Sequence, residues 1–176
     1  VTVGYAGVFA AGLVGHLYLI RYMINMRKPV DITKDLRQMH NMILGILGFG
    51  LCFSFLGTML GGIWADQSWG RFWGWDPKEN GALLIVLWSV IVFHARMAGL
   101  IRERGIALAS VFACVVVVTS WFGINLLGVG LHSYGFTQGI AALLYAFYAF
   151  EFLFMIVAAV LLRKASLSHK QTKVIS

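Results

Sequence analysis

Apolar residues occur along this chain in five long stretches separated by short polar segments. The stretches cover approximately residues 3–23, 42–64, 81–99, 106–130 and 140–162. Each is long enough to cross about 30 Å of hydrocarbon as a helix that rises about 1.5 Å per residue. The pattern therefore predicts an all-α membrane protein, a bundle of about five transmembrane helices over residues 1–162, followed by a basic tail over residues 163–176.

The composition supports a membrane protein and excludes several other classes. Hydrophobic residues make up 60% of the chain and charged residues only 12%, about half the charged share of a soluble domain. A soluble fold of this length has too little interior for so much apolar sequence, so a soluble enzyme, a disulfide scaffold and a disordered tail are excluded. Cys52 and Cys114 lie inside apolar stretches without metal-ligand spacing, which indicates buried small hydrophobic residues.

The basic residues predict the orientation. All lysines and arginines except Arg71 and Lys78 fall on one side of the predicted bundle. The positive-inside rule places that side in the cytoplasm, with the N-terminus outside and the C-terminus inside. Segments 65–80 and 131–139 are then exported. The net charge of +7 is explained as an orientation signal at the lipid bilayer, and nucleic acid is not expected as a partner.

The first exported segment is rich in tryptophan. It lies within W-A-D-Q-S-W-G-R-F-W-G-W-D-P-K-E-N, residues 64–80. One interpretation is an interfacial aromatic belt, since Trp favours the headgroup level. The other is a platform for a large planar, apolar ligand at the outer face, which Gly70 and Gly74 would allow to approach the backbone. The five aromatic residues concerned are Trp64, Trp69, Phe72, Trp73 and Trp75.

The end of this segment carries a helix-start signal. Asp76 is suited to the N-cap, Pro77 to the first helical position and Glu79 to the third position of a capping box. The sequence D-P-K-E therefore predicts the start of the third span. A capping role does not exclude a role in ligand binding.

Two histidines are candidate ligands. His132 lies in G-V-G-L-H-S-Y-G-F, beyond the outer end of the fourth span and on the same side as the tryptophans. An imidazole there is suited to ligate porphyrin iron; the alternative is a solvated loop histidine. His94 lies within the third span, where ionisable groups are costly and indicate function. Its alternative is a neutral imidazole bonded to a nearby carbonyl.

Other ionisable groups are weaker candidates. His16 lies in the first span at a depth similar to that of His94, which allows a bis-imidazole site or a relay. Glu151, near the middle of the fifth span, is expected to face the bundle interior, paired or protonated. His40 and His169 stand among basic residues and are interpreted as surface groups.

The two exported motifs, in this order, resemble the haem-handling proteins of cytochrome c biogenesis, whose signature is an exported tryptophan-rich "WWD" segment. W-D-P-K-E, then F-H-A-R one helix later and G-L-H-S-Y after the next helix, is most similar to the CcsA (ResC) type of System II. Asn80 also matches the W-D-P-V-E-N form of System I proteins. A CcmC- or CcmF-like protein that delivers haem to a chaperone is therefore an alternative, and a non-haem transport or scaffold subunit is another.

The resemblance implies a function and a site. Haem b, as substrate, would be held at the outer face by the tryptophan segment with His132 as an axial ligand, and His94 would belong to an intramembrane haem site. The protein would be part of a holocytochrome c synthase (haem lyase) in a bacterial inner or thylakoid membrane. It would act with a CcsB (ResB)-like membrane protein to join haem to the C-x-x-C-H motif of apocytochrome c. The implied site residues are His132, His94, Trp69, Trp73, Trp75, Asp76, Pro77 and Glu79.

One departure from the family pattern leads to a further expectation. The family's first external histidine would fall at or just before Val1, and no histidine stands there. No signal-peptide pattern is visible either, and the chain enters its first helix at once. We therefore expect this sequence to be a piece of a longer polypeptide, with the missing ligand just upstream of Val1.

Overall fold

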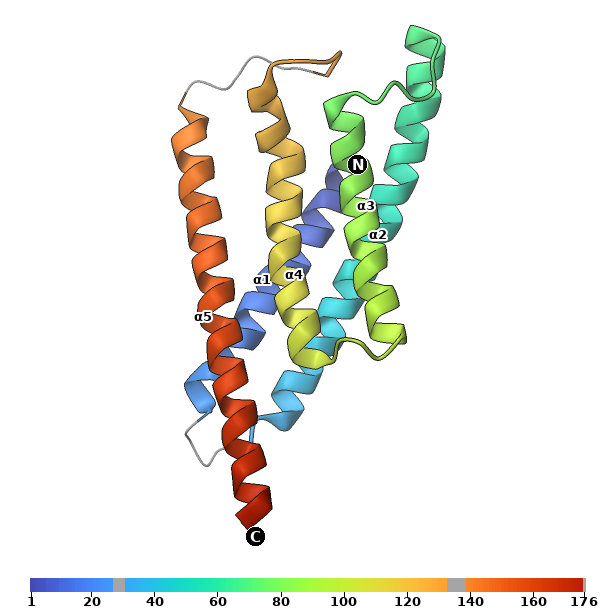
Figure 1. The fold of residues 1–176 in the computed structure, drawn as a ribbon. Helices are drawn as coiled ribbons and strands as arrows, with labels where there is room; N and C mark the ends of the chain where they lie inside the picture. Colours follow the sequence, from blue (N-terminus) through green and yellow to red (C-terminus); the bar gives the residue numbers. More distant parts are fainter. Residues whose placement is uncertain (27–30, 133–138, 176) are drawn as a thin grey trace.

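Five α-helices form the part of the chain that the structure describes (Figure 1). The computed structural model describes residues 1–26, 31–132 and 139–175, with the side chains of the last helix described to residue 165. The helices are α1 (Thr2–Asn25), α2 (Thr33–Trp69), α3 (Pro77–Met97), α4 (Glu103–Val118) and α5 (Ile140–Ile175). Helices α1, α2, α3 and α5 each include a stretch long and apolar enough to cross a membrane, and so does the fourth span, Glu103–Leu127, which begins with α4. The described residues contain no strand. The predicted fold class, an all-α polytopic membrane bundle, is confirmed.

Helix α1 is the centre of the bundle. It packs most extensively against α2 and α4, while α3 contacts α2 and α4 and α5 lies against α4; Figure 1 shows α1 crossing behind α4. Two clusters of buried apolar side chains form the interior, one around Val8 and Ile85 and the other around Tyr18 and Ile106. Large apolar side chains also cover the outer faces of α2 and α5. Such helices, apolar on all sides, are typical of membrane spans.

Helices α1 and α2 approach closely where small residues meet. A Cβ atom added to Gly50 would lie 2.6 Å from the backbone nitrogen of Val8, whereas one added to Gly45 on the same helix meets nothing within 4 Å. Close contact between small residues is how membrane helices pack tightly without a hydrophobic driving force. The α1–α2 contact therefore depends on the missing side chain at Gly50.

We expect Gly50→Ala to destabilise the bundle by about 1–3 kcal/mol, the usual cost of forcing extra atoms into a packed interior. Gly45→Ala is the matched control and should be neutral or slightly stabilising, since alanine is the better helix former. Unfolding by a denaturing detergent, followed by circular dichroism, measures both. Equal midpoints for the two variants would contradict the close packing.

Several sequence predictions need correction. Helix α2 continues to Trp69, so residues 64–69 of the predicted loop are helical; nothing between Ala65 and Ser68 breaks a helix, and Gly70 ends it with a left-handed backbone (φ 69°). Cys114 is buried as predicted, but Cys52 is exposed on α2. His40 was interpreted as a surface group, yet it is only 7% exposed because α2 begins at Thr33 and carries it into the bundle.

The fourth span departs from a regular helix near its end. A π-helical turn, η1 (Thr119–Gly123), follows α4 and leads into a 3₁₀ turn, η2 (Ile124–Leu127). The Thr119 hydroxyl lies 2.7 Å from the carbonyl oxygen of Val115 and 2.8 Å from the hydroxyl of Tyr148 on α5. Turns of this kind occur frequently at functional sites.

Candidate functional site

Asp76 begins α3 with the predicted capping box. Its Oδ1 accepts a hydrogen bond of 2.9 Å from the backbone N–H of Lys78. Glu79 Oε2 in turn accepts from the backbone N–H groups of Asp76 (3.1 Å) and Gly74 (2.8 Å). With Pro77 at the first helical position, these bonds satisfy backbone donors that a helix start leaves free. The short connection from Gly70 to α3 is therefore fixed in place by its own last residues.

Asp76 also holds the segment that follows the fourth span. Its Oδ2 accepts a 2.6 Å hydrogen bond from the backbone N–H of Leu131, and its Oδ1 lies 3.3 Å from Nδ1 of His132. Gly130 permits this approach, since its φ is +93° and a Cβ there would collide with the carboxylate. The two predicted exported segments therefore meet at one carboxylate.

The charge on this carboxylate is maintained although Asp76 is only 5% exposed. Burial favours the neutral acid, but hydrogen bonds from the backbone of Lys78 and Leu131, together with nearby His132, outweigh it and lower the pKa of Asp76. Because a carboxylate accepts hydrogen bonds, an ionised Asp76 favours the His132 tautomer whose proton is on Nδ1, the ring nitrogen nearest to it. Within the described residues, no hydrogen bond is formed by the other ring nitrogen, Nε2.

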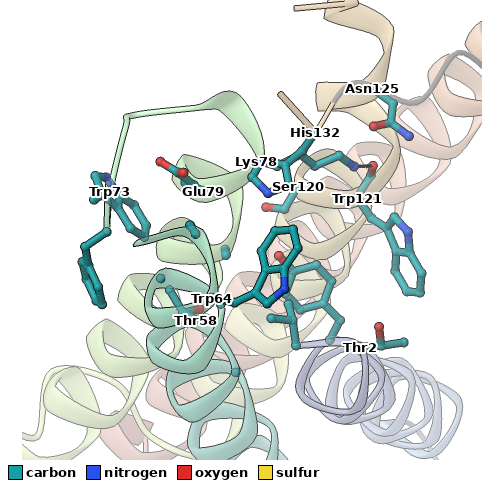
Figure 2. A pocket seen from close by; sticks show the side chains of 18 residues that line it. Thr2, Thr58, Trp64, Trp73, Lys78, Glu79, Ser120, Trp121, Asn125 and His132 are labelled. Atoms are coloured by element: carbon teal, nitrogen blue, oxygen red, sulfur yellow. Dashed lines mark hydrogen bonds between the residues drawn. The ribbon is translucent and has the colours of Figure 1, made fainter. Parts of the chain in front are cut away.

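A cavity of about 430 Å³ lies beside His132, at the end of the bundle that carries the tryptophan loop (Figure 2). Its walls come from α1, α2, the connection before α3, α3 itself and the irregular end of the fourth span. Trp64, Trp73 and Trp121 supply large aromatic surfaces, and Lys78, Glu79 and His132 supply ionisable groups. Its size lies within the range of small-molecule sites, which are mostly apolar with a few placed polar groups.

Polar atoms around the cavity remain unsatisfied by the protein. Among the described residues, the buried atoms Ser120 Oγ and Asn125 Oδ1 have no hydrogen-bond partner, and His132 Nδ1 has only its 3.3 Å contact with Asp76. The ammonium group of Lys78 donates a hydrogen bond to the carbonyl oxygen of Trp121. Unpaired buried polar groups are uncommon in folded proteins, and here they belong to residues that line the cavity.

The structure divides the predicted tryptophan platform into separate parts. Trp73 lines the cavity, whereas the ring of Trp69 packs edge-on against the imidazole of His132 with 4.9 Å between centroids. Trp75 is 70% exposed and has a left-handed backbone (φ 58°). Sequence reasoning missed Trp121 and gave Lys78 no binding role. The signal available for Trp121 was a tryptophan at the outer end of span four, shortly before the histidine motif.

His94 lies in a different part of the molecule. It is on the exposed side of α3 and its Nδ1 donates a 2.9 Å hydrogen bond to the carbonyl oxygen of Val90, the carbonyl contact that was one of its two interpretations. Seventeen residues of helix separate it from Pro77, about 25 Å. His94 and His132 therefore belong to separate sites.

The remaining predicted groups have distinct positions. His16 does not pair with His94; its Nε2 lies 3.1 Å from Oε2 of Glu151. Glu151 thus faces the bundle interior and is paired, as predicted. Residues 133–138 of the second exported segment lie outside the described residues, and so does the side chain of His169.

Comparison with known proteins gives a consistent result. A family model described as "Cytochrome C assembly protein" matches residues 1–132. The chain is similar to proteins called "Cytochrome c biogenesis protein CcsA". That of Chlorella vulgaris is 43% identical over 96 residues, which cover 54% of this chain and 30% of that protein. That of Chlamydomonas reinhardtii is 35% identical over 135 residues, covering 76% and 38% respectively. The chain thus spans about a third of the length of these relatives.

Proposed function

Because the chain belongs to the cytochrome c assembly protein family, we propose that it binds haem in the cavity beside His132 and presents it for covalent attachment to apocytochrome c. In this proposal it is the CcsA-like part of a cytochrome c synthase. The tryptophan-loop end faces the periplasm or the thylakoid lumen, and a CcsB-like membrane protein is its partner. Haem is the substrate.

The observation that carries the proposal is the contact between Asp76 and His132. A histidine that ligates a metal commonly donates its other ring N–H to a carboxylate, which fixes the tautomer and makes the ligating nitrogen more basic. Here Asp76 lies 3.3 Å from Nδ1, which leaves Nε2 as the nitrogen available to haem iron. Trp69 packs against the same ring and restricts its rotation.

The cavity supports the proposal through its shape and chemistry. The aromatic rings of Trp64, Trp73 and Trp121 suit a flat apolar ring system, for which aromatic stacking is favourable. Lys78 reaches the cavity, and a propionate carboxylate could replace the Trp121 carbonyl as its acceptor. The cavity is partly open to the outside, so one edge of a bound porphyrin would remain within reach of another protein.

The chain's contribution to the reaction is placement of the substrate. In thioether formation each cysteine thiol adds across a haem vinyl group, so that sulfur bonds to one vinyl carbon and the proton goes to the other. Reactivity belongs to the haem and the thiols; the protein holds them in a productive orientation. His132 would hold the iron, and the aromatic side chains that line the cavity would fix the plane of the porphyrin.

The absorption spectrum of the detergent-purified protein tests the proposal. Oxidised and reduced protein should show the Soret and α bands of ligated haem. A colourless preparation after growth with ample haem would overturn the proposal and favour a non-haem transport or scaffold subunit.

Two neighbouring tryptophans provide a matched pair of variants. We expect Trp73→Ala to weaken haem binding about tenfold, because it removes a ring that lines the cavity, a loss of about 1.5 kcal/mol. Trp75→Ala removes a ring that is 70% exposed and should change haem affinity about twofold or less. Haem titrations followed at the Soret band measure both. Equal losses for the two variants would contradict the assignment of this cavity as the haem site.

A further inference from the structure

A second cluster of ligand-type side chains lies inside the bundle, away from the cavity. His16 on α1, Cys114 on α4 and Glu151 on α5 place one nitrogen, one sulfur and one oxygen atom within 4.8 Å of one another. Cys114 is fully buried, and the side chains of His16 and Glu151 are only 12% and 4% exposed. His16 lies eleven residues beyond Tyr5 of the cavity wall, about 16 Å deeper along α1. The haem proposal makes no use of this cluster.

We propose that His16, Cys114 and Glu151 form a binding site for a zinc-like divalent metal ion. Imidazole, thiolate and carboxylate are the three protein ligand types of zinc. In a tetrahedral site the ligand atoms stand about 3.3–3.8 Å apart, so closure around a metal needs movements of about 1 Å. Such movements are within the reach of the Cys114 and Glu151 side chains, and the fourth position would remain open to water.

The hydrogen bonds of the cluster prepare His16 for this role. Its Nδ1 donates a 2.9 Å hydrogen bond to the carbonyl oxygen of Gly12, so the other nitrogen, Nε2, directs its lone pair toward the cluster. Nε2 and Oε2 of Glu151, 3.1 Å apart, must then share one proton. The ring is also packed against Phe154, 4.6 Å between centroids. At metal sites, the hydrogen-bond and packing partners of a ligating histidine fix its tautomer and the plane of its ring in the same way.

Charge balance makes the site compatible with a membrane interior. Without metal, the cluster holds one proton between His16 and Glu151 and another on the thiol of Cys114, which donates to the carbonyl oxygen of Phe9 at 3.5 Å. Binding of one divalent cation releases both protons and leaves a neutral imidazole, one thiolate and one carboxylate. The exchange of two protons for one M²⁺ changes no net charge. A net charge buried in hydrocarbon would be costly, and this exchange avoids it.

Zinc binding to the full chain in detergent micelles tests the inference. Chelator-stripped protein equilibrated with Zn²⁺ should retain one zinc per chain. X-ray absorption at the zinc edge should show one sulfur at about 2.3 Å, with the other ligands at about 2.0–2.2 Å. Haem iron does not contribute at this edge, so failure of this inference and failure of the haem proposal are distinguishable.

The second cysteine provides the control. Cys114→Ser should remove the sulfur signal and weaken zinc binding at least tenfold, whereas Cys52→Ser, on an exposed position of α2, should leave both unchanged. Glu151→Gln should weaken zinc binding while keeping the sulfur signal at saturating zinc. Wild-type protein that binds less than one zinc, or that binds zinc only through nitrogen and oxygen atoms, would overturn the inference. A sulfur signal that persists in Cys114→Ser would do the same.

Discussion

His132→Ala should reduce haem binding at the cavity by at least about 100-fold and leave cells with less than about a tenth of their c-type cytochromes. Loss of supporting contacts alone typically costs 10–100-fold at metal sites, and this change removes the ligand itself. The helices should be unaffected, because the contacts that the His132 side chain makes among the described residues are with Trp69 and Asp76. Haem staining of membranes and the spectrum of the purified protein measure the two effects.

Added imidazole separates lost ligation from lost structure. The alanine variant leaves an imidazole-sized space between Trp69 and Asp76, which free imidazole can occupy. We expect millimolar imidazole to restore the reduced α band of His132→Ala and to have no such effect on Trp73→Ala. Normal cytochrome levels in the His132→Ala strain would contradict axial ligation by this residue.

Asp76→Asn should have the second largest effect, about a 10- to 100-fold loss of haem affinity with little loss of stability. Asparagine is among the best N-cap residues, so the start of α3 should persist, and its side-chain oxygen can still accept from Lys78 or Leu131. What disappears is the negative charge 3.3 Å from Nδ1 of His132. Without it the imidazole is a weaker donor to iron, and the haem reduction potential should shift upward. Haem titration and redox titration measure the two quantities.

Asp76→Ala is the informative comparison for that variant. It loses the helix cap, at a cost of about 1 kcal/mol, and also leaves the backbone N–H of Leu131 without its acceptor, about 1–3 kcal/mol more. We therefore expect Asp76→Ala to lower both thermal stability and haem binding, whereas Asp76→Asn lowers haem binding alone. If both variants bound haem as tightly as the wild type, Asp76 would be a structural cap only.

Short-range features of this protein could be read from its sequence. The five spans follow from hydropathy, and the start of α3 follows from D-P-K-E because the capping bonds join Asp76 to residues at most three positions away. The end of α2 was placed too early because Asp66, Gln67 and Ser68 are polar, although polarity alone does not end a helix. Only the left-handed Gly70 does so.

Contacts between distant residues could not be predicted in the same way. Leu131 and Asp76 are 55 positions apart, and His16 and Glu151 are 135 positions apart. Both contacts depend on which helices are neighbours and on how each helix is rotated about its axis. Hydropathy gives neither the neighbours nor the rotation. His94 and His16 share a similar depth, but they lie on helices whose facing sides carry other residues, so depth alone suggested a pairing that does not occur. Glu151 was predicted to face inward because a carboxyl group in lipid is too costly.

The π-helical turn at Thr119–Gly123 has a consequence for how this protein can evolve. Such a turn accommodates one residue more than a regular helical turn, and each residue of an α-helix advances the chain by about 100°. The two ends of the fourth span therefore differ in phase. Before the turn, Cys114 faces the bundle interior; after it, Asn125 lines the cavity, as do Ser120 and Trp121 within the turn itself. A single-residue insertion or deletion in this turn would rotate one end of the span without disturbing the other. The part of the span that packs in the bundle and the part that lines the cavity can therefore diversify independently.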